Sequence, residues 1–147
     1  MLDALADFVD RWKEQSDLDV SLLVQPPGTS LDTLPPAAEL QLLRIVQEAL
    51  SNVRKHAEAK HVEVRIIAAD GEVETVIVDD GRGFDTIRSR SPDRTPHFGL
   101  STMRERAESV GGKLQIVSTL GGGTRVEVRL PTRSPSSLDG ASMRPSS

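Results

Sequence analysis

The chain has 147 residues, 37% of them hydrophobic, which is enough for one globular domain with its own core. Eighteen Lys and Arg residues stand against twenty-two Asp and Glu residues, so a net charge of −4 and an aromatic content of 3% disfavour nucleic acid as a partner. The lack of cysteine excludes disulfides and thiolate sites, and we find no membrane span or secretory signal, so we expect a cytoplasmic protein.

The first part of the chain predicts a helix, a strand and a second helix. Apolar residues at helical spacing predict an amphipathic helix over residues 2–16. Residues 18–24 are rich in Leu and β-branched side chains and are closed by a Pro-Pro-Gly turn, which predicts a strand. The clearest helix runs over residues 36–57, with proline at a position that a helix start tolerates.

The second part predicts four strands and one more helix. An Asp-Gly turn joins strands 62–68 and 73–78 as a hairpin. Residues 81–98 lack periodicity and predict a long loop, followed by a helix over 100–110 that Gly111 and Gly112 end. Two further strands are predicted, and the chain closes with a tail rich in Ser and Pro that we expect to be disordered; these segments are 113–118, 124–130 and 132–147.

This order of elements predicts an α+β fold in one domain, residues 1–131. Strands and helices that alternate irregularly suit an open sheet with helices on one face. We therefore expect a two-layer α/β sandwich, with a mixed sheet of about five strands and about three helices.

The long helix carries a row of polar residues beside its apolar stripe. Glu48, Asn52 and His56 follow one another at intervals of four and so share one side of the helix. A carboxylate can accept a proton and an amide oxygen can bind Mg²⁺, so the row is suited to line a site. The same spacing is also typical of an exposed polar face.

Acidic residues follow directly after an apolar strand in the segment Val76-Ile77-Val78-Asp79-Asp80-Gly81-Arg82-Gly83-Phe84. A buried carboxylate accepts a hydrogen bond from an exocyclic amine, as adenine has, and glycines let backbone approach a ligand closely. The alternative is a plain acidic turn with glycines for its geometry.

Two weaker signals lie further along the chain. Gly99 opens a helix whose first amides are suited to phosphate oxygens, with Arg104 and Arg106 nearby to add positive charge. Thr124 follows three glycines, in either a plain hairpin turn or one whose hydroxyl reaches a base. The sequence contains no P-loop and no dinucleotide-binding fingerprint.

Three blocks in this order resemble the ATP-binding domain of the gyrase, Hsp90, histidine kinase and MutL superfamily. The blocks are LPPAAELQLLRIVQEALSNVRKHAEAKHVEVRI, VDDGRGFD and HFGLSTMRERAESVGGKLQIVSTLGGGTRVEVRLP. They are most similar to sensor histidine kinases of the nitrate-sensor type. The resemblance spans roughly residues 2–131 and implies the Bergerat fold of that superfamily.

The resemblance implies roles for residues of the long helix. Asn52 would ligate Mg²⁺, and Glu48 would orient or activate the reacting group. Lys55 or His56 would lie near the phosphates, so that Glu48, Asn52 and His56 are the expected catalytic residues. Many histidine kinases have Asn at the position of Glu48. The nitrate-sensor branch and the gyrase-like ATPases resemble this chain in having Glu there.

The resemblance also implies an adenine pocket, with Asp79 binding the adenine amine. The other expected nucleotide-binding positions are Gly81 and Gly83 of the pocket, Gly99 of the second glycine box with Leu100 beside it, and Thr124 near adenine. The ATP lid would be the loop over about residues 86–97. The lid's end, His97-Phe98-Gly99, departs from the family pattern because it lacks the paired glycine of many kinase lids.

The activity implied is that of a protein histidine kinase, with ATP and Mg²⁺ as cofactors. The γ-phosphate would pass to a histidine on a separate dimerisation module and then to a response regulator. His56, His61 and His97 each lack the following acidic residue that is typical of the acceptor. We therefore expect a monomeric catalytic fragment of a homodimeric kinase, cytoplasmic or the cytoplasmic part of a membrane-bound sensor, with no nucleic acid as partner.

Two alternatives stay open at this point. An anti-sigma serine kinase of the same superfamily has a similar EAxxN helix and a similar length. A nucleotide-sensing adaptor with no transfer activity is the other. The GLSTMRERAESVGG segment favours the histidine kinases over the first alternative, and the complete motif set disfavours the second.

Overall fold

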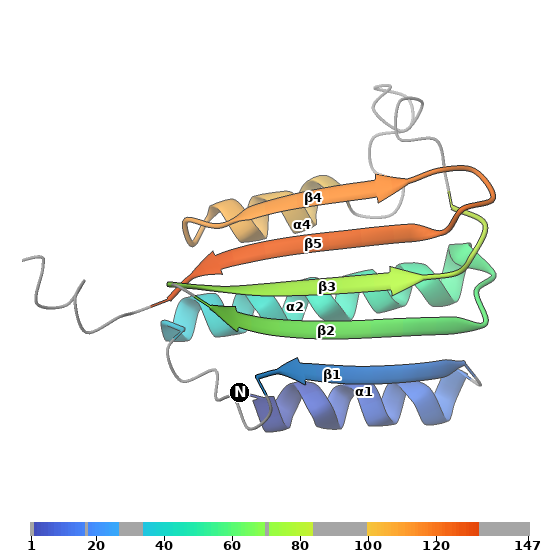
Figure 1. Ribbon diagram of the computed structural model, residues 1–147, viewed down its shortest axis with the longest axis horizontal. Helices are drawn as coiled ribbons and strands as arrows, with labels where there is room; N and C mark the ends of the chain where they lie inside the picture. Colours follow the sequence, from blue (N-terminus) through green and yellow to red (C-terminus); the bar gives the residue numbers. More distant parts are fainter. Residues whose placement is uncertain (1, 17, 27–33, 70, 84–99, 133–147) are drawn as a thin grey trace, which may run out of the picture.

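The computed structural model describes residues 2–16, 18–26, 34–69, 71–83 and 100–132. These residues form one five-stranded mixed sheet with helices on one face, which confirms the expected α+β sandwich (Figure 1). The expected lid, about residues 86–97, and nearly all of the C-terminal tail lie outside the described residues. The elements are α1 Leu2–Ser16, β1 Asp19–Gln25, α2 Pro36–Asn52, η1 Val53–Ala57, β2 His61–Ala69, β3 Glu72–Asp79, α4 Leu100–Glu108, β4 Lys113–Ser118 and β5 Thr124–Pro131.

The strand order is β1-β2-β3-β5-β4, and one terminus of each of the five strands lies at the same end of the sheet. β1 runs parallel to β2, and the other neighbouring pairs are antiparallel. Val62 near the start of β2 pairs with Asp79 at the end of β3, and Asp79 pairs in turn with Thr124 at the start of β5. Ser118 at the end of β4 also pairs with Thr124. This end of the sheet is where the expected site residues lie.

Period-two alternation decides which face of each strand is buried. Val62, Val64 and Ile66 of β2 are buried, and so are Val126, Val128 and Leu130 of β5. Together with the buried residues of α1, α2 and α4 they make one continuous core between the two layers. No helix in the described ranges is long and apolar enough to cross a membrane.

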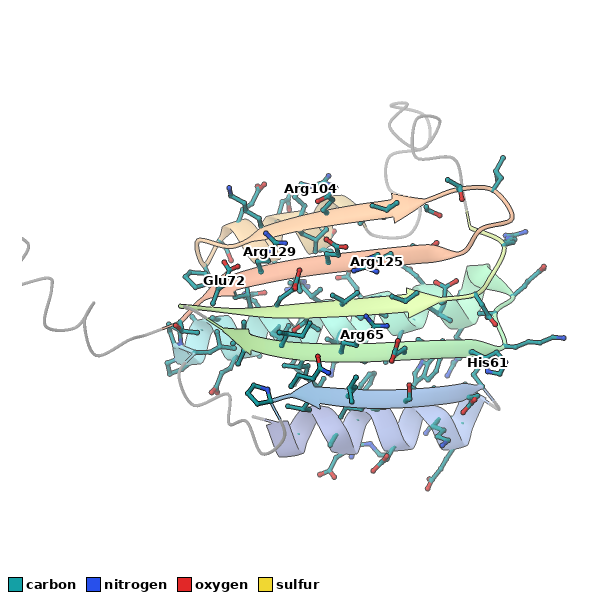
Figure 2. The ribbon with its side chains drawn as sticks, viewed as in Figure 1. His61, Arg65, Glu72, Arg104, Arg125 and Arg129 are labelled. Carbon is teal, nitrogen blue, oxygen red and sulfur yellow. The ribbon has the colours of Figure 1, made fainter. Side chains whose placement is uncertain are left out.

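The opposite face of the sheet is covered by charged side chains instead of a second helix layer (Figure 2). Arg65 pairs with Glu63 at 2.9 Å, and Arg129 of β5 pairs with Glu74 of β3 at 3.2 Å. Such exposed pairs contribute little to stability, roughly 0–1 kcal/mol each. Their main effect is to keep this face polar.

The long helix differs from the expectation in its last turn. A continuous α-helix was expected over 36–57, but α2 ends at Asn52 and the chain continues as a π-helical turn, η1. Glu58 follows with a positive φ of 54°, which ends the helix. π-helical turns inside helices occur frequently at functional sites. Of the expected polar row, Glu48 and Asn52 therefore lie in the α-helix and His56 lies in the π-helical turn, a difference that the spacing of four residues could not show.

Candidate functional site

The C-terminal end of α2 lies at the same end of the molecule as the end of β3 (Figure 1). The connectivity requires this, because η1 leads within a few residues into β2, and the start of β2 pairs with the end of β3. The segments that carry Asn52 and Asp79 therefore lie at the same end of the molecule, as the expected site requires.

Asp79 ends β3 as a buried carboxylate. Its residue is only 7% exposed, and the Gly81 N–H donates to its Oδ1 at 2.8 Å. Burial raises the pKa of Asp79, and the nearby charge of Asp80 acts in the same direction. Hydrogen bonds from the backbone amides of Gly81 and Thr124 oppose this shift. A buried carboxylate at the end of a strand is suited to accept a hydrogen bond from a ligand.

Asp80, the next residue, is exposed and has a different role. Its Oδ1 accepts the backbone N–H groups of Lys60 and His61 at 2.8 and 3.0 Å. These two hydrogen bonds lower the pKa of Asp80. Asp80 therefore ties the end of β3 to the start of β2, and only one of the two adjacent acids remains suited to a ligand.

The glycines after β3 allow two backbone segments to touch. Gly83 has a φ of +66°, and a Cβ built there would lie 2.0 Å from the Thr119 carbonyl oxygen. A Cβ on Gly123 would lie 2.2 Å from the carbonyl oxygen of Asp79. Gly121 N–H also donates to the Arg82 carbonyl. The segment after Asp79 is therefore held against the β4–β5 turn by contacts that no side chain would permit.

Thr124 is oriented by a short hydrogen-bond chain. Ser118 Oγ donates to the Gly123 carbonyl at 3.0 Å, and it lies 2.8 Å from Thr124 Oγ1. Because Ser118 has one hydroxyl proton and a carbonyl can only accept, Thr124 must donate to Ser118. The lone pairs of Thr124 Oγ1 are then the part of this hydroxyl that can meet a ligand.

The helix side of the site carries Glu48, Asn52 and Lys55. Asn52 is half-buried and Lys55 is exposed. Glu48 Oε1 accepts from Arg106 Nε of α4 at 3.4 Å, whereas its Oε2 is buried and has no hydrogen-bond partner among the described residues. A buried carboxylate oxygen without a partner is unfavourable unless something else satisfies it, so it marks a position where a ligand or reacting group would fit.

The structure thus brings together most of the residues that the sequence singled out. Asp79, Gly81, Gly83 and Thr124 meet at one end of the sheet, and the last turns of α2 and η1, which carry Glu48, Asn52 and Lys55, lie at the same end of the molecule. His56 lies in η1 and Leu100 begins α4, whereas Gly99 lies outside the described residues.

The sequence reasoning missed Ser118, Gly123 and the pairing of Arg106. Arg106 was expected near phosphates, but within the described part of the chain its guanidinium contacts Glu48 and Gln41. Strand alternation was the available signal for Ser118, because it places Ser118 on the buried side of β4 with Leu114.

The oxygen ligands near the end of α2 suit a divalent cation only together with other ligands. The described ranges contain no group of three or more His, Cys, Asp or Glu side chains that could hold a metal by themselves. Mg²⁺ usually takes one or two protein oxygens and completes its shell with waters and substrate phosphates. The amide oxygen of Asn52 fits that pattern, so a cation here would have to arrive with a phosphate-bearing ligand.

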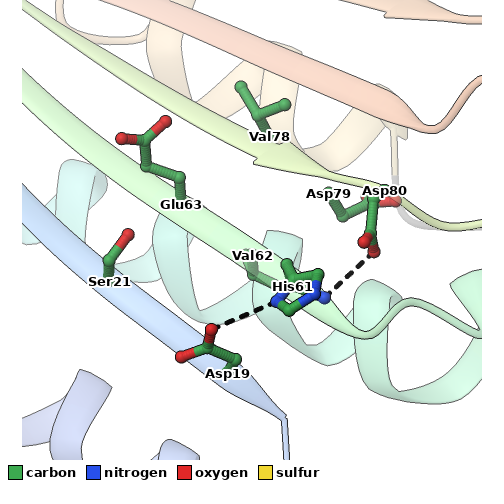
Figure 3. Close-up of a pocket in the computed structure, with 8 residues that line it drawn as sticks. All are labelled: Asp19, Ser21, His61, Val62, Glu63, Val78, Asp79 and Asp80. Carbon is green, nitrogen blue, oxygen red and sulfur yellow. Dashed lines mark hydrogen bonds and ion pairs between the residues drawn. The ribbon is translucent and has the colours of Figure 1, made fainter.

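A pocket of about 220 Å³ opens on the charged face of the sheet (Figure 3). His61 Nδ1 lies 3.1 Å from Asp19 Oδ2, and the His61 backbone N–H binds Asp80. The polar groups at its centre are thus already paired with one another. The pocket lies where β1 and β2 begin and β3 ends, and Asp79 is one of its lining residues.

Comparisons with known proteins agree with this geometry. The model of the family described as histidine kinase-, DNA gyrase B-, and HSP90-like ATPase matches residues 37–134. The sensor histidine kinase LiaS of Bacillus subtilis is 32% identical over 131 residues, which is 88% of this chain and 33% of LiaS. The nitrate/nitrite sensor protein NarQ of Escherichia coli is 35% identical over 126 residues, covering 85% of this chain and 21% of NarQ.

A solved structure supports the fold. The histidine kinase domain of the Erythrobacter litoralis EL346 blue-light activated histidine kinase aligns with a TM-score of 0.71 at 20% identity, over 91% of this chain and 62% of that one. The chain spans a third or less of the two curated relatives, LiaS and NarQ.

Proposed function

Because the chain belongs to the histidine kinase-, DNA gyrase B-, and HSP90-like ATPase family, we propose that it is the ATP-binding catalytic domain of a two-component sensor histidine kinase. The observation that carries the proposal is the buried carboxylate of Asp79 at the end of β3, which the Gly81 amide orients. It faces Thr124 across the ladder and lies at the same end of the molecule as the end of α2.

Asp79 accepts the hydrogen bond of the adenine exocyclic amine. The Gly81 amide holds Oδ1 from one side, so the carboxylate is oriented before the ligand arrives. Thr124 presents acceptor lone pairs next to Asp79, because the Thr124 hydroxyl donates its hydrogen bond to Ser118. Gly83 and Gly123 shape this end of the pocket by the close backbone contacts described above.

Asn52 would hold, through its amide oxygen, the Mg²⁺ that accompanies the nucleotide. The ion would neutralise charge on the phosphate oxygens. Lys55, exposed in η1 after Asn52, adds positive charge on the same side, and His56 lies next to it in the chain. Glu48 orients or activates the group that receives the γ-phosphate.

Phosphoryl transfer depends mainly on positioning and charge stabilisation, which this arrangement supplies. The acceptor is a histidine on a dimerisation module of the parent protein, and the phosphoryl group then passes to an aspartate of a response regulator. The relatives named above favour this reading over an anti-sigma serine kinase and over a nucleotide-sensing adaptor. The domain works in the cytoplasm as part of a homodimeric kinase.

Adjacent aspartates provide a matched test of the proposal. Asp79→Asn removes the negative charge of the buried carboxylate, and Asp80→Asn makes the same change at the exposed neighbour. Calorimetry with ATP is expected to show binding by the original chain and by Asp80→Asn. Asp79→Asn is expected to lose at least about tenfold in affinity, the loss of a charge-assisted hydrogen bond. Equal affinity of all three proteins would remove the adenine assignment.

A further inference from the structure

We infer that Arg106 is a positioning residue that holds Glu48 for phosphoryl transfer, an inference that rests on the proposed function. Arg106 lies on α4 and Glu48 lies on α2, and the two residues are separated by 58 positions in the chain. Arg106 Nε donates to Glu48 Oε1 at 3.4 Å, and the two side chains are 30% and 29% exposed. The contact is thus half-buried and joins two helices of the same layer.

A second hydrogen bond fixes the direction of the guanidinium group. Arg106 Nη1 donates to Gln41 Oε1 at 3.3 Å. Gln41 and Glu48 are seven residues apart and so lie on one face of α2, two turns from each other. The planar guanidinium thereby spans two side chains of α2, which restricts the rotation of Glu48 more than a single contact would.

The two oxygens of Glu48 have different environments. Oε1 is held by Arg106, whereas Oε2 is buried and lacks a hydrogen-bond partner in the described part of the chain. The ion pair with Arg106 therefore engages one carboxylate oxygen and leaves the other oxygen for a proton donor. A base beside a phosphoryl acceptor requires this arrangement, in which one oxygen is fixed in place and the other can accept the proton.

In hydrolysis, the simplest transfer, water is the acceptor. A bond forms between the water oxygen and the γ-phosphorus while the bond from the γ-phosphorus to the bridging oxygen breaks, and ADP leaves with that electron pair. The water proton goes to Glu48 Oε2. Arg106 does not touch the reacting atoms in this scheme, so its effect should appear only through Glu48.

The fold should tolerate loss of the Arg106 side chain. Met103 and Ala107 of the same helix are fully buried and anchor α4 in the core. The pair itself is half-exposed, and such pairs contribute little to stability. Variants at position 106 should therefore fold and can be assayed as the full chain.

The test measures Mg-ATP affinity by calorimetry and the kcat of phosphate release for five variants. These are Arg106→Gln, Arg106→Lys, Glu48→Gln, the double variant Glu48→Gln/Arg106→Gln and the control Arg129→Gln, which breaks an ion pair on the opposite face. We expect Arg106→Gln to lower kcat at least about tenfold with the Kd changed less than about threefold. Arg106→Lys should recover part of kcat, because an ammonium group can still reach Glu48.

The double variant decides whether Arg106 acts through Glu48. If it does, the double variant should have the kcat of Glu48→Gln alone. Multiplied losses, an unchanged kcat of Arg106→Gln, or a loss equal to that of the Arg129→Gln control would overturn the inference. An original chain that fails to bind Mg-ATP would overturn the proposed function and this inference with it, whereas normal binding with an unaffected Arg106→Gln would overturn the inference alone.

Discussion

Thr124 lies directly opposite Asp79 in the β3–β5 ladder, and the Thr124 amide is one of the groups that act on the Asp79 carboxylate. A buried acid and a hydroxyl therefore occupy neighbouring positions at one end of the sheet. Because the Thr124 hydroxyl donates its hydrogen bond to Ser118, Asp79 and Thr124 both present acceptors in the same region. A ligand bound here should offer donors, as the amine of adenine does.

Thr124→Val is expected to weaken ATP binding by about tenfold, the effect of one lost hydrogen bond in a site. The change keeps the shape of the side chain and removes only its hydroxyl. Ser118 keeps its bond to the Gly123 carbonyl at 3.0 Å, so no buried donor loses its acceptor. Calorimetry with ATP checks the loss, and Thr124→Ser, which keeps the hydroxyl, is the control. Equal affinities for the valine and serine variants would contradict the role of this hydroxyl.

Local patterns predicted most of the fold, because the signals that carry it are local. The Asp-Gly turn, the two alternating strands around it and the glycines after α4 fixed the elements within a few residues. The same alternation implies that Asp79 is buried, since Val73, Thr75 and Ile77 of β3 are buried as well. The alternation along β3 was thus sufficient to identify Asp79 as a buried acid at the end of the strand.

Long-range contacts could not be predicted in the same way. The Arg106–Glu48 pair depends on how α4 packs against α2, which no pattern within either helix encodes. The pairing of Asp80 depends on the amides of Lys60, just before β2, and of His61, at the start of β2. The π-helical turn after Asn52 carries no sequence signal that distinguishes it from an α-helical one.

Asn52→Ala is expected to separate cation binding from adenine binding. Without the amide oxygen, the affinity for ATP in the presence of Mg²⁺ should fall toward the affinity measured in EDTA, which should itself stay unchanged. Calorimetry with and without Mg²⁺ provides both values. Asn52→Asp is the matched comparison, because it keeps a hard oxygen ligand. A loss of ATP affinity in EDTA as large as that in Mg²⁺ would contradict a role limited to the cation.

Gly83→Ala is expected to lower the free energy of unfolding by about 3 kcal/mol or more. The new Cβ would meet the Thr119 carbonyl oxygen at 2.0 Å, and that atom belongs to backbone that cannot simply turn away. Gly71→Ala is the matched control, because Gly71 also has a positive φ, of +84°, but no atom within 4 Å of the new Cβ. The control should cost about 1 kcal/mol from backbone strain alone.

Urea denaturation of both glycine variants measures the difference. Because Gly83 holds the segment after Asp79 against the β4–β5 turn, its variant should also lose ATP affinity, whereas Gly71→Ala should not. Equal stability of Gly83→Ala and Gly71→Ala would contradict this prediction, because it would mean that backbone movement relieves the contact with Thr119.

Substitution of the two adjacent aspartates, Asp79 and Asp80, by Asn should change the melting temperature in opposite directions at about pH 7. The pKa of Asp79 is raised in the folded state, so its favourable contribution is complete below the unfolded value of about 3.8 and is lost as pH rises through the folded pKa. At about pH 7 the buried carboxylate therefore opposes folding, and Asp79→Asn should melt at a higher temperature than the original chain. This advantage should shrink as the pH is lowered toward about 4.

Asp80 provides the opposite case in the same experiment. Its pKa is lowered by the amides of His61 and Lys60, so its contribution is present above the unfolded value of about 3.8 and is lost as pH falls through the folded pKa. Asp80→Asn should therefore melt below the original chain at about pH 7, with the difference closing in acid. Thermal unfolding followed by circular dichroism at several pH values checks both. Shifts of the same sign for the two variants would mean that burial does not distinguish the ligand-binding acid from the structural one.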